Sequence, residues 1–170
     1  MENNFTVTID KTMFVPWYKR LANLLIDIAV VYCIFLILGI IAALLTHLDY
    51  TGFYDWITTL NPVTDRLITT LVMVLYLFVI ESFTQRSVGK FITGTMVVSE
   101  DGSKPKTRSF LIRALCRIIW LEALTFIGST PRGWHDYTAN TFVVDRKKYL
   151  EALTVKKSIN EIGSEQVYEL

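Results

Sequence analysis

The chain has 170 residues, of which 52% are hydrophobic and only 19% are charged, and its formal net charge is +1. A water-soluble domain carries closer to about a quarter charged residues, so the composition favours an integral membrane protein. The nearly balanced charge excludes the broad basic surface of a nucleic-acid-binding protein, and we expect no nucleic acid among its partners.

The first membrane-spanning helix is predicted over about residues 17–45. Pro16 is typical of a helix start, and the aromatic pair after it is typical of a membrane interface. The run from Ile28 to Leu45 contains no charged residue, and roughly 20 helical residues cross the ~30 Å core of a bilayer. Residues 1–15 precede this helix, and within them Asn4 to Asp10 alternates apolar and polar side chains as a short strand does. The apolar run is too long for a signal peptide, so we expect the helix to be retained.

The second spanning helix is predicted over about residues 66–83, after a loop from His47 to Arg66. Its charge-free run, Leu67 to Ile80, is short. We therefore expect Glu81 to lie near one membrane interface and not deep in the bilayer. The loop carries aromatic residues and three aspartates, but no lysine or arginine before Arg66.

A polar, basic connection follows from Gln85 to Arg108, and it contains the strand-like segment Thr95 to Ser99. Thr138 to Asp145 repeats this pattern further along the chain. We predict that both are short strands on the cytoplasmic side. A tail over residues 146–170 is first basic and then polar, with room for one short helix.

A third helix is predicted over about residues 109–127, and its place relative to the membrane is decided by charge. Arg113 and Arg117 lie one turn apart on one face, as in an amphipathic helix in the plane of the membrane. Lysine and arginine are concentrated before the first span and after the second, which places the N-terminus in the cytoplasm. An interfacial or re-entrant third helix keeps the basic tail there too, whereas a spanning helix is the alternative.

The sequence thus predicts an all-α integral membrane protein of the bacterial inner-membrane type. Two transmembrane helices and an amphipathic third helix, interfacial or re-entrant with spanning as the alternative, form one membrane domain over residues 16–145. Short cytoplasmic β-strands complete it.

Asp27 is the first candidate for chemistry, because a carboxylate inside a spanning helix is costly unless it is paired, hydrated or protonated. Arg20, Asn23 and Asp27 share one helix face over two turns. Asp27 is therefore either an ion- or proton-binding group or one half of a buried pair with Arg113 or Arg117. The two interpretations are compatible.

Glu81 should reach the same membrane layer from the antiparallel second helix. Together with Arg20, Asp27, Arg113 and Arg117, it would place two carboxylates beside several cations. Such a set suits cation or proton exchange, since desolvation raises a carboxylate pKa and a cation lowers it. A static salt-bridge lattice has the same composition, and the sequence leaves both open.

Two further motifs are weak. Ser87 to Gly94 lacks the first glycine of a phosphate-binding loop, and Trp134-His135-Asp136 is more typical of a solvated loop than of a metal site. We find no nucleophile set and no metal-ligand spacing, so we expect no enzyme activity, no metal and no cofactor.

Several features form a combined pattern that is more specific than any one of them. In chain order they are Arg20, Asp27, Glu81-Ser82, Gly89-Lys90, Gly94, Val97-Val98, Gly102, Arg113, Arg117, Asp136, Thr141 and Val143-Val144. Over about Trp17 to Val144 the chain resembles the RDD family of small bacterial membrane proteins, named for one arginine and two aspartates. Asp136 is then the second aspartate, and the resemblance implies that it caps or pairs with the arginines of the third helix. His135 stands where a small or apolar residue is expected.

For the family, transport of unknown ligands has been suggested, and sodium/proton exchange has been attributed to some members. The resemblance therefore implies an oligomeric transporter or cation/proton exchanger, with Asp27 and Glu81 as the ion- or proton-binding candidates. Arg20, Asn23, Arg113, Arg117 and Asp136 would be their charge partners.

The alternative is a non-catalytic accessory subunit or scaffold of a larger membrane complex, in which the same charges serve only for packing. In either case, we expect the basic cytoplasmic residues to attract anionic lipid.

Overall fold

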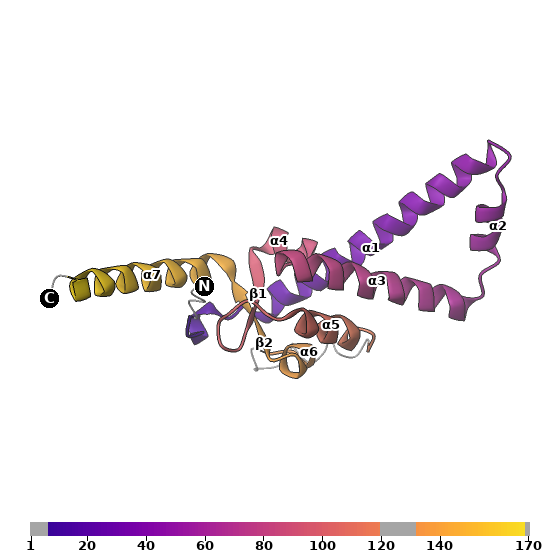
Figure 1. The fold of residues 1–170 in the computed structure, drawn as a ribbon. Coiled ribbons are helices and arrows are strands. Elements are labelled where there is room, and N and C mark those ends of the chain that lie inside the picture. Colours follow the sequence, from indigo (N-terminus) through magenta and orange to yellow (C-terminus); the bar gives the residue numbers. More distant parts are fainter. Residues whose placement is uncertain (1–6, 120–131, 169–170) are drawn as a thin grey trace.

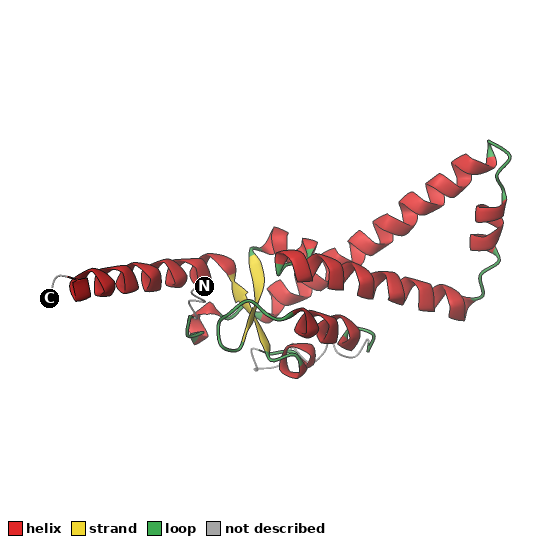
Figure 2. Cartoon of the chain, in the orientation of Figure 1, coloured by secondary structure: helices red, strands yellow, loops and turns green. Residues whose placement is uncertain are grey.

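The computed structural model describes residues 7–119 and 132–168, and most of them are helical (Figures 1 and 2). The elements in chain order are η1 (Lys11–Met13), α1 (Trp17–Thr46), α2 (Gly52–Thr58), α3 (Pro62–Thr84), α4 (Val88–Thr93), β1 (Thr95–Ser99), α5 (Thr107–Cys116), α6 (Trp134–Thr138), β2 (Thr141–Asp145) and α7 (Arg146–Tyr168).

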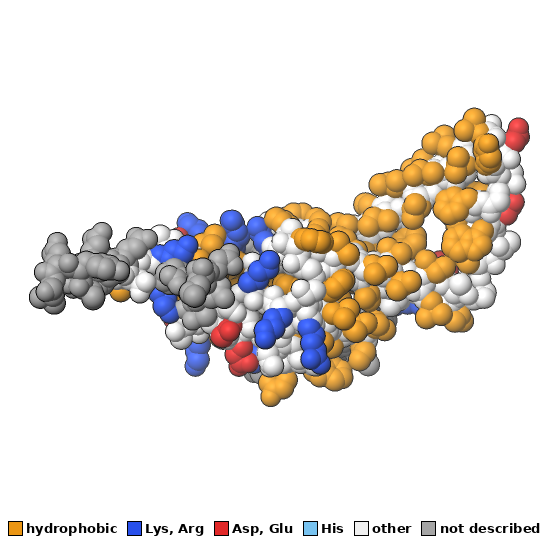
Figure 3. Space-filling view, viewed as in Figure 1, with side chains coloured by type: hydrophobic (Ala, Val, Ile, Leu, Met, Phe, Trp, Pro, Cys, Tyr) orange, Lys and Arg blue, Asp and Glu red, His pale blue; other side chains and the backbone are white. Residues whose placement is uncertain are grey.

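Helices α1 and α3 are long and apolar enough to cross a membrane. Their 30 and 23 residues correspond to about 45 and about 35 Å. Only 11% of the most apolar window of each helix is buried within the protein, whereas the core helix of a soluble protein would be mostly covered. Hydrophobic side chains accordingly cover the outside of this half of the molecule, while lysine and arginine gather at the other end (Figure 3). Both predicted spans are present.

The second span begins four residues earlier than expected, and a helix lies within the predicted loop. Asn61 caps α3 by accepting a hydrogen bond from Thr64 N at 2.9 Å, and Pro62 occupies the first helical position, where its missing N–H carries no penalty. α1 and α3 cross near one end and diverge towards the other, where α2 lies between their open ends (Figure 1).

The two predicted valine-rich strands pair with each other. β1 and β2 form an antiparallel ladder in which Val97 lies opposite Val143 and Met96 opposite Val144. The two strands are therefore neighbours in one small sheet. Val98 and Val144 are fully buried in a small core that also contains Val7 and Met13.

The strand predicted over Asn4 to Asp10 is wrong for its described part, residues 7–10, which are neither helix nor strand. Asp10 instead caps η1, and the chain reaches the sheet only through a single bridge between Phe14 and Val144. Val7 contributes packing: its carbonyl lies so close to Gly102 that a Cβ there would be 1.9 Å away. The alternating pattern therefore reflects burial of Val7 and not strand pairing.

The third helix is shorter than predicted, and the tail helix is longer. α5 ends at Cys116 and packs on α3 through Ala114, Val74 and Leu77. Residues 117–119 are turn, and 120–127 lie outside the described residues. α7 has 23 residues and extends away from the spans beyond the sheet (Figure 1).

Candidate functional site

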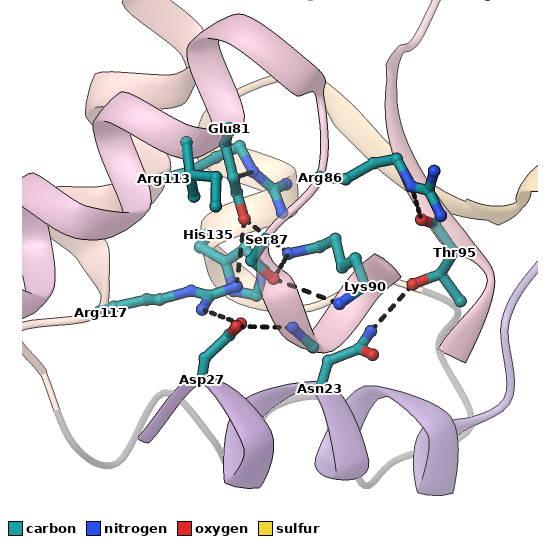
Figure 4. Close-up of polar contacts among 12 residues, drawn as sticks. Asn23, Asp27, Glu81, Arg86, Ser87, Lys90, Thr95, Arg113, Arg117 and His135 are labelled. Atoms are coloured by element: carbon teal, nitrogen blue, oxygen red, sulfur yellow. Dashed lines mark hydrogen bonds and ion pairs between the residues drawn. The ribbon is translucent and has the colours of Figure 1, made fainter. Parts of the chain in front are cut away.

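A buried set of seven ionisable side chains lies where α1, α3, α4, α5 and α6 meet, and we call it the charge cluster. Figure 4 shows the part of it around Asp27, Glu81 and Lys90. Its members are Arg20 and Asp27 on α1, Glu81 on α3, Lys90 on α4, Arg113 on α5, Arg117 at the end of α5, and Asp136 on α6. Six of them are buried, and the seventh, Arg117, has a side chain that is 11% exposed. The structure therefore brings together the layer that the sequence predicted, includes Asp136 as the family resemblance implied, and adds Lys90.

Asp136 joins α6 to α1 and α5. Arg20 Nη1 donates to Asp136 Oδ2 at 2.7 Å, and Arg113 Nη1 donates to Oδ1. The amide of Gly133 also donates to Oδ2, at 3.3 Å, as a helix cap. Burial by itself would raise the pKa of the Asp136 carboxyl, but the charges of His135, Arg113 and Arg20 outweigh it and hold that pKa well below its usual range. Asp136 is therefore a charged anchor.

The interpretation of Trp134-His135-Asp136 as a solvated loop is wrong, since Asp136 is fully buried and His135 is 5% exposed. The three residues open the short helix α6, and the fold turns the carboxylate inwards onto the arginines. The resemblance, and not the local pattern, indicated this pairing.

Glu81 is the second centre of the charge cluster, and it is buried within the protein and not exposed at its surface. Lys90 Nζ donates to its Oε1 at 2.6 Å, and Arg113 Nε donates to its Oε2 at 3.4 Å. Arg117 Nη2 lies 3.8 Å from Oε1. Both oxygens of Glu81 therefore hold a hydrogen bond from a cation.

The two cations that bond to Glu81 respond differently to their surroundings. Burial lowers the pKa of Lys90, and the nearby Arg117 and Arg113 lower it further, although Glu81 raises it. The pKa of Arg113 is raised, because Asp136 and Glu81 together outweigh its burial. Arg113 therefore remains charged and links the Glu81 centre to the Asp136 centre.

Asp27 is held asymmetrically. Its Oδ1 accepts hydrogen bonds from Gly89 N at 2.9 Å and from the Tyr76 hydroxyl at 3.1 Å. Among the described residues, its Oδ2 is buried without a hydrogen bond and has one ion pair, with Arg117 Nη1 at 3.8 Å. Of the two predicted partners, Arg117 is therefore the one that pairs with Asp27.

A close helix crossing makes this arrangement possible. A Cβ on Gly89 would lie 2.4 Å from the carbonyl oxygen of Asn23, so only glycine lets α4 approach α1 this closely. The crossing directs Gly89 N at Asp27 and places the Asn23 amide between the Thr93 and Thr95 hydroxyls. The predicted stripe of Arg20, Asn23 and Asp27 is buried as a whole. Arg20 bonds to α6 and β2, Asn23 to α4 and β1, and Asp27 to α3 and α4.

Sequence reasoning did not identify Lys90 and Tyr76 as part of the site. For Lys90 a signal was present: Ser87 caps α4 at its start, and Gly94, at φ 72°, ends it. These two residues enclose a short helix that carries Lys90 inwards. Tyr76 gives no such signal, because its role depends on where α4 crosses α1.

The charge cluster contains four cationic and three carboxylate side chains, an excess of one positive charge. A cavity of about 510 Å³ adjoins it, between α1, α3 and the end of α5. Arg117 lines the cavity together with Tyr32, Arg66, Thr69 and Thr70 and several aliphatic side chains. Among the described residues, no group of three or more His, Cys, Asp or Glu side chains could hold a metal ion.

A family model described as the RDD family matches residues 14–140, which include every member of the charge cluster. The searches of curated proteins and of solved structures returned no match.

Proposed function

Since the chain belongs to the RDD family, and is thus a membrane protein with two apolar helices, we propose that it is one subunit of an oligomeric transporter. In this proposal Asp27 takes up and releases a proton or a small cation. The observation that carries it is the unsatisfied Oδ2 atom of Asp27.

The three carboxylates of the charge cluster differ in what they can exchange. Asp136 and Glu81 each accept two or more hydrogen bonds from charged donors, so releasing a partner would leave buried cations uncompensated. Asp27 Oδ2 has a single ion pair at 3.8 Å, longer than a hydrogen bond. An ionisable group of this kind inside a spanning helix is typical of proton and ion pathways.

The oligomer follows from the number of spanning helices. Two helices cannot enclose a pathway, and α1 and α3 also diverge away from the charge cluster (Figure 1). Large apolar side chains such as Leu36 and Leu71 are more than half exposed. Copies of the chain packed through these faces would complete the wall of a pathway.

The orientation we propose places the N-terminus and the sheet in the cytoplasm of a bacterium with the chain in its inner membrane. Lysine and arginine gather at the sheet end of the molecule (Figure 3), and such residues favour the cytoplasmic side. At that face they would attract anionic lipid with about 1 kcal/mol per charge. Equal binding to neutral and anionic vesicles at low salt would contradict this.

The test is proton flux in proteoliposomes under sodium, potassium and pH gradients, with the native chain and with Asp27→Asn. We expect flux from the native chain and its loss in the variant, because the amide cannot carry a proton or a charge. Asp65→Asn is the matched control, since this exposed residue lies in the first turn of α3. If neither the native chain nor the control transports under any gradient, the transporter proposal is wrong.

A second candidate function is an accessory subunit of a larger membrane complex. It is favoured by the aromatic side chains of α2, where Phe53 stacks on Trp56 with ring centroids 6.2 Å apart and both are exposed. Co-purification of one stoichiometric membrane partner after mild detergent extraction would support it. Recovery of the chain alone, combined with flux, would exclude it.

A further inference from the structure

Arg117 is the least firmly held cation of the charge cluster. Its two ion pairs, to Asp27 Oδ2 and to Glu81 Oε1, are both 3.8 Å long. Within the described residues, its Nη1 is buried without a hydrogen-bond partner. By comparison, Lys90 lies 2.6 Å from the same Glu81 oxygen. The guanidinium of Arg117 is therefore paired by charge but not bound by a good hydrogen bond.

The same side chain forms one end of the cavity between α1 and α3. The cavity wall on α1 includes Leu24 and Ile28, three residues before and one residue after Asp27, while Asp27 itself does not line it. Arg117 pairs with Asp27 (Figure 4) and also lines the cavity, so this side chain connects the Asp27 carboxylate with that space. A ligand in the cavity would meet Arg117 before Asp27.

The chemistry of the cavity suits an anion attached to an apolar body. Its wall is mainly aliphatic between Arg117 and Arg66, which lies on α3 towards α2. Within the described part of the chain, the Arg66 side chain forms no ion pair or hydrogen bond. The volume of about 510 Å³ is in the range of small-molecule sites, and guanidinium groups are suited to carboxylates and phosphates. The excess positive charge of the charge cluster also favours an anion in the cavity.

We infer that Arg117 is the binding residue for an organic monoanion, with one carboxylate or phosphate group on an apolar body, and that this anion binds together with a proton on Asp27. The inference rests on the proposed proton uptake by Asp27, and it names the second ligand of that site. The anion and the proton would cross as a neutral pair.

The coupling follows from charge. When a proton from solution bonds to Asp27 Oδ2, the neutral carboxyl no longer attracts Arg117, and the guanidinium becomes available to an anion in the cavity. Binding of the anion in turn lowers the positive charge that opposes the proton, so each ligand increases the affinity for the other by the same factor. No covalent bond other than this O–H bond forms or breaks.

The groups that face Asp27 are compatible with this exchange. They are the Tyr76 hydroxyl from α3, the Gly89 amide from α4 and Arg117 from the end of α5. Two further charges act without a hydrogen bond to Asp27: Lys90 acts on Asp27 itself, and Glu81 acts on Tyr76. The hydroxyl and the amide both bond to Oδ1, so the proton can bond to Oδ2 while they stay in place.

The experiment measures binding of radiolabelled benzoate to the full chain in phosphatidylcholine nanodiscs, by scintillation proximity. For the native chain we expect benzoate to bind at least about tenfold more tightly at about pH 5 than at about pH 8, since proton and anion binding are coupled. Asp27→Asn, which imitates the protonated carboxyl, should bind tightly at both pH values. Arg117→Gln should lose binding at both.

Matched controls separate the site from general charge effects. Arg108→Gln changes an exposed arginine at the start of the same helix and should bind as the native chain does. Arg117→Lys keeps the charge without the planar fork, and weaker binding with the same pH dependence is expected. Unchanged binding in Arg117→Gln, or native binding that does not vary with pH, would overturn the inference.

Three further outcomes identify the source of the anion and separate the proposals. If phosphatidylglycerol in the nanodiscs displaces benzoate from the native chain and from the Arg108→Gln control alike, the anion site stands and its occupant is a lipid headgroup. If Asp27→Asn abolishes proton flux while the native chain binds neither benzoate nor phosphatidylglycerol at either pH, the anion site is refuted and the transporter proposal remains. If pH-dependent benzoate binding is found but no proton flux occurs even with benzoate present, the site stands and the transporter proposal fails.

Discussion

Replacement of Asp136 by asparagine removes one negative charge from the charge cluster with almost no change in volume. The Asp136 carboxylate is fully buried, and its two oxygens face Arg20 and Arg113, which are 7% and 1% exposed. The amide can accept a hydrogen bond but cannot balance two guanidinium charges. The substitution therefore leaves buried positive charge without its counter-charge.

The expected loss of stability is about 3 kcal/mol, because breaking a buried ion pair by removing one partner costs about 3–5 kcal/mol and the amide retains part of the hydrogen bonding. Asp65→Asn is the control: this residue is exposed in the first turn of α3, and it should lose no more than about 1 kcal/mol from the helix dipole. The measurement is unfolding of the purified protein by added dodecyl sulfate, followed by tryptophan fluorescence.

The same variant gives a dependence on pH with a defined sign. The folded-state pKa of Asp136 lies well below its ordinary value, so the carboxylate stabilises the fold above the ordinary pKa of about 4 and this contribution is lost as the pH falls further. The native chain should therefore lose more stability than Asp136→Asn below about pH 4. The idea that Asp136 is buried and ion-paired would be refuted by either of two results: Asp136→Asn loses less than about 1 kcal/mol of unfolding free energy at neutral pH, or the stabilities of variant and native chain fall in parallel on acidification.

Two other substitutions test contacts that position the site and the tail. Gly89→Ala should destabilise the protein by about 1–3 kcal/mol and reduce proton flux, because a Cβ would lie 2.4 Å from the Asn23 carbonyl oxygen and would move Gly89 N away from Asp27. Thermal unfolding and flux measurements check this. Native values in both would contradict the close crossing. Tyr149→Phe should cost about 1 kcal/mol, because the Tyr149 hydroxyl donates to the Gly102 carbonyl at 2.7 Å. Burial and Asp101 raise the pKa of Tyr149, so its contribution is present below about pH 10 and is lost above it; chemical unfolding at several alkaline pH values should show a smaller loss in the variant than in the native chain.

Charge-free runs in the sequence were sufficient to predict the two long apolar helices, although not the 23-residue tail helix α7. The charge-free runs predicted α1 and α3 because a bilayer requires about 20 apolar residues in a row whatever their neighbours are. The two valine-rich segments were recognisable as strands from their residue types. The short helices α4 and α6 were not predicted, because helices of 6 and 5 residues are not stable alone and depend on tertiary packing.

The sequence by itself determined that this is a membrane protein, and that Arg20, Asn23 and Asp27 share one face of its first helix. Only the tertiary structure decided which charges meet. A guanidinium or ammonium group reaches several ångströms from its backbone, so its partner depends on how the helices cross and not on spacing along the chain. The close approach of α4 at Gly89 brings Lys90 to Glu81 and a backbone amide to Asp27. The turn into α6 brings Asp136 to Arg20 and Arg113, while Arg117 pairs with Asp27 Oδ2 and with Glu81.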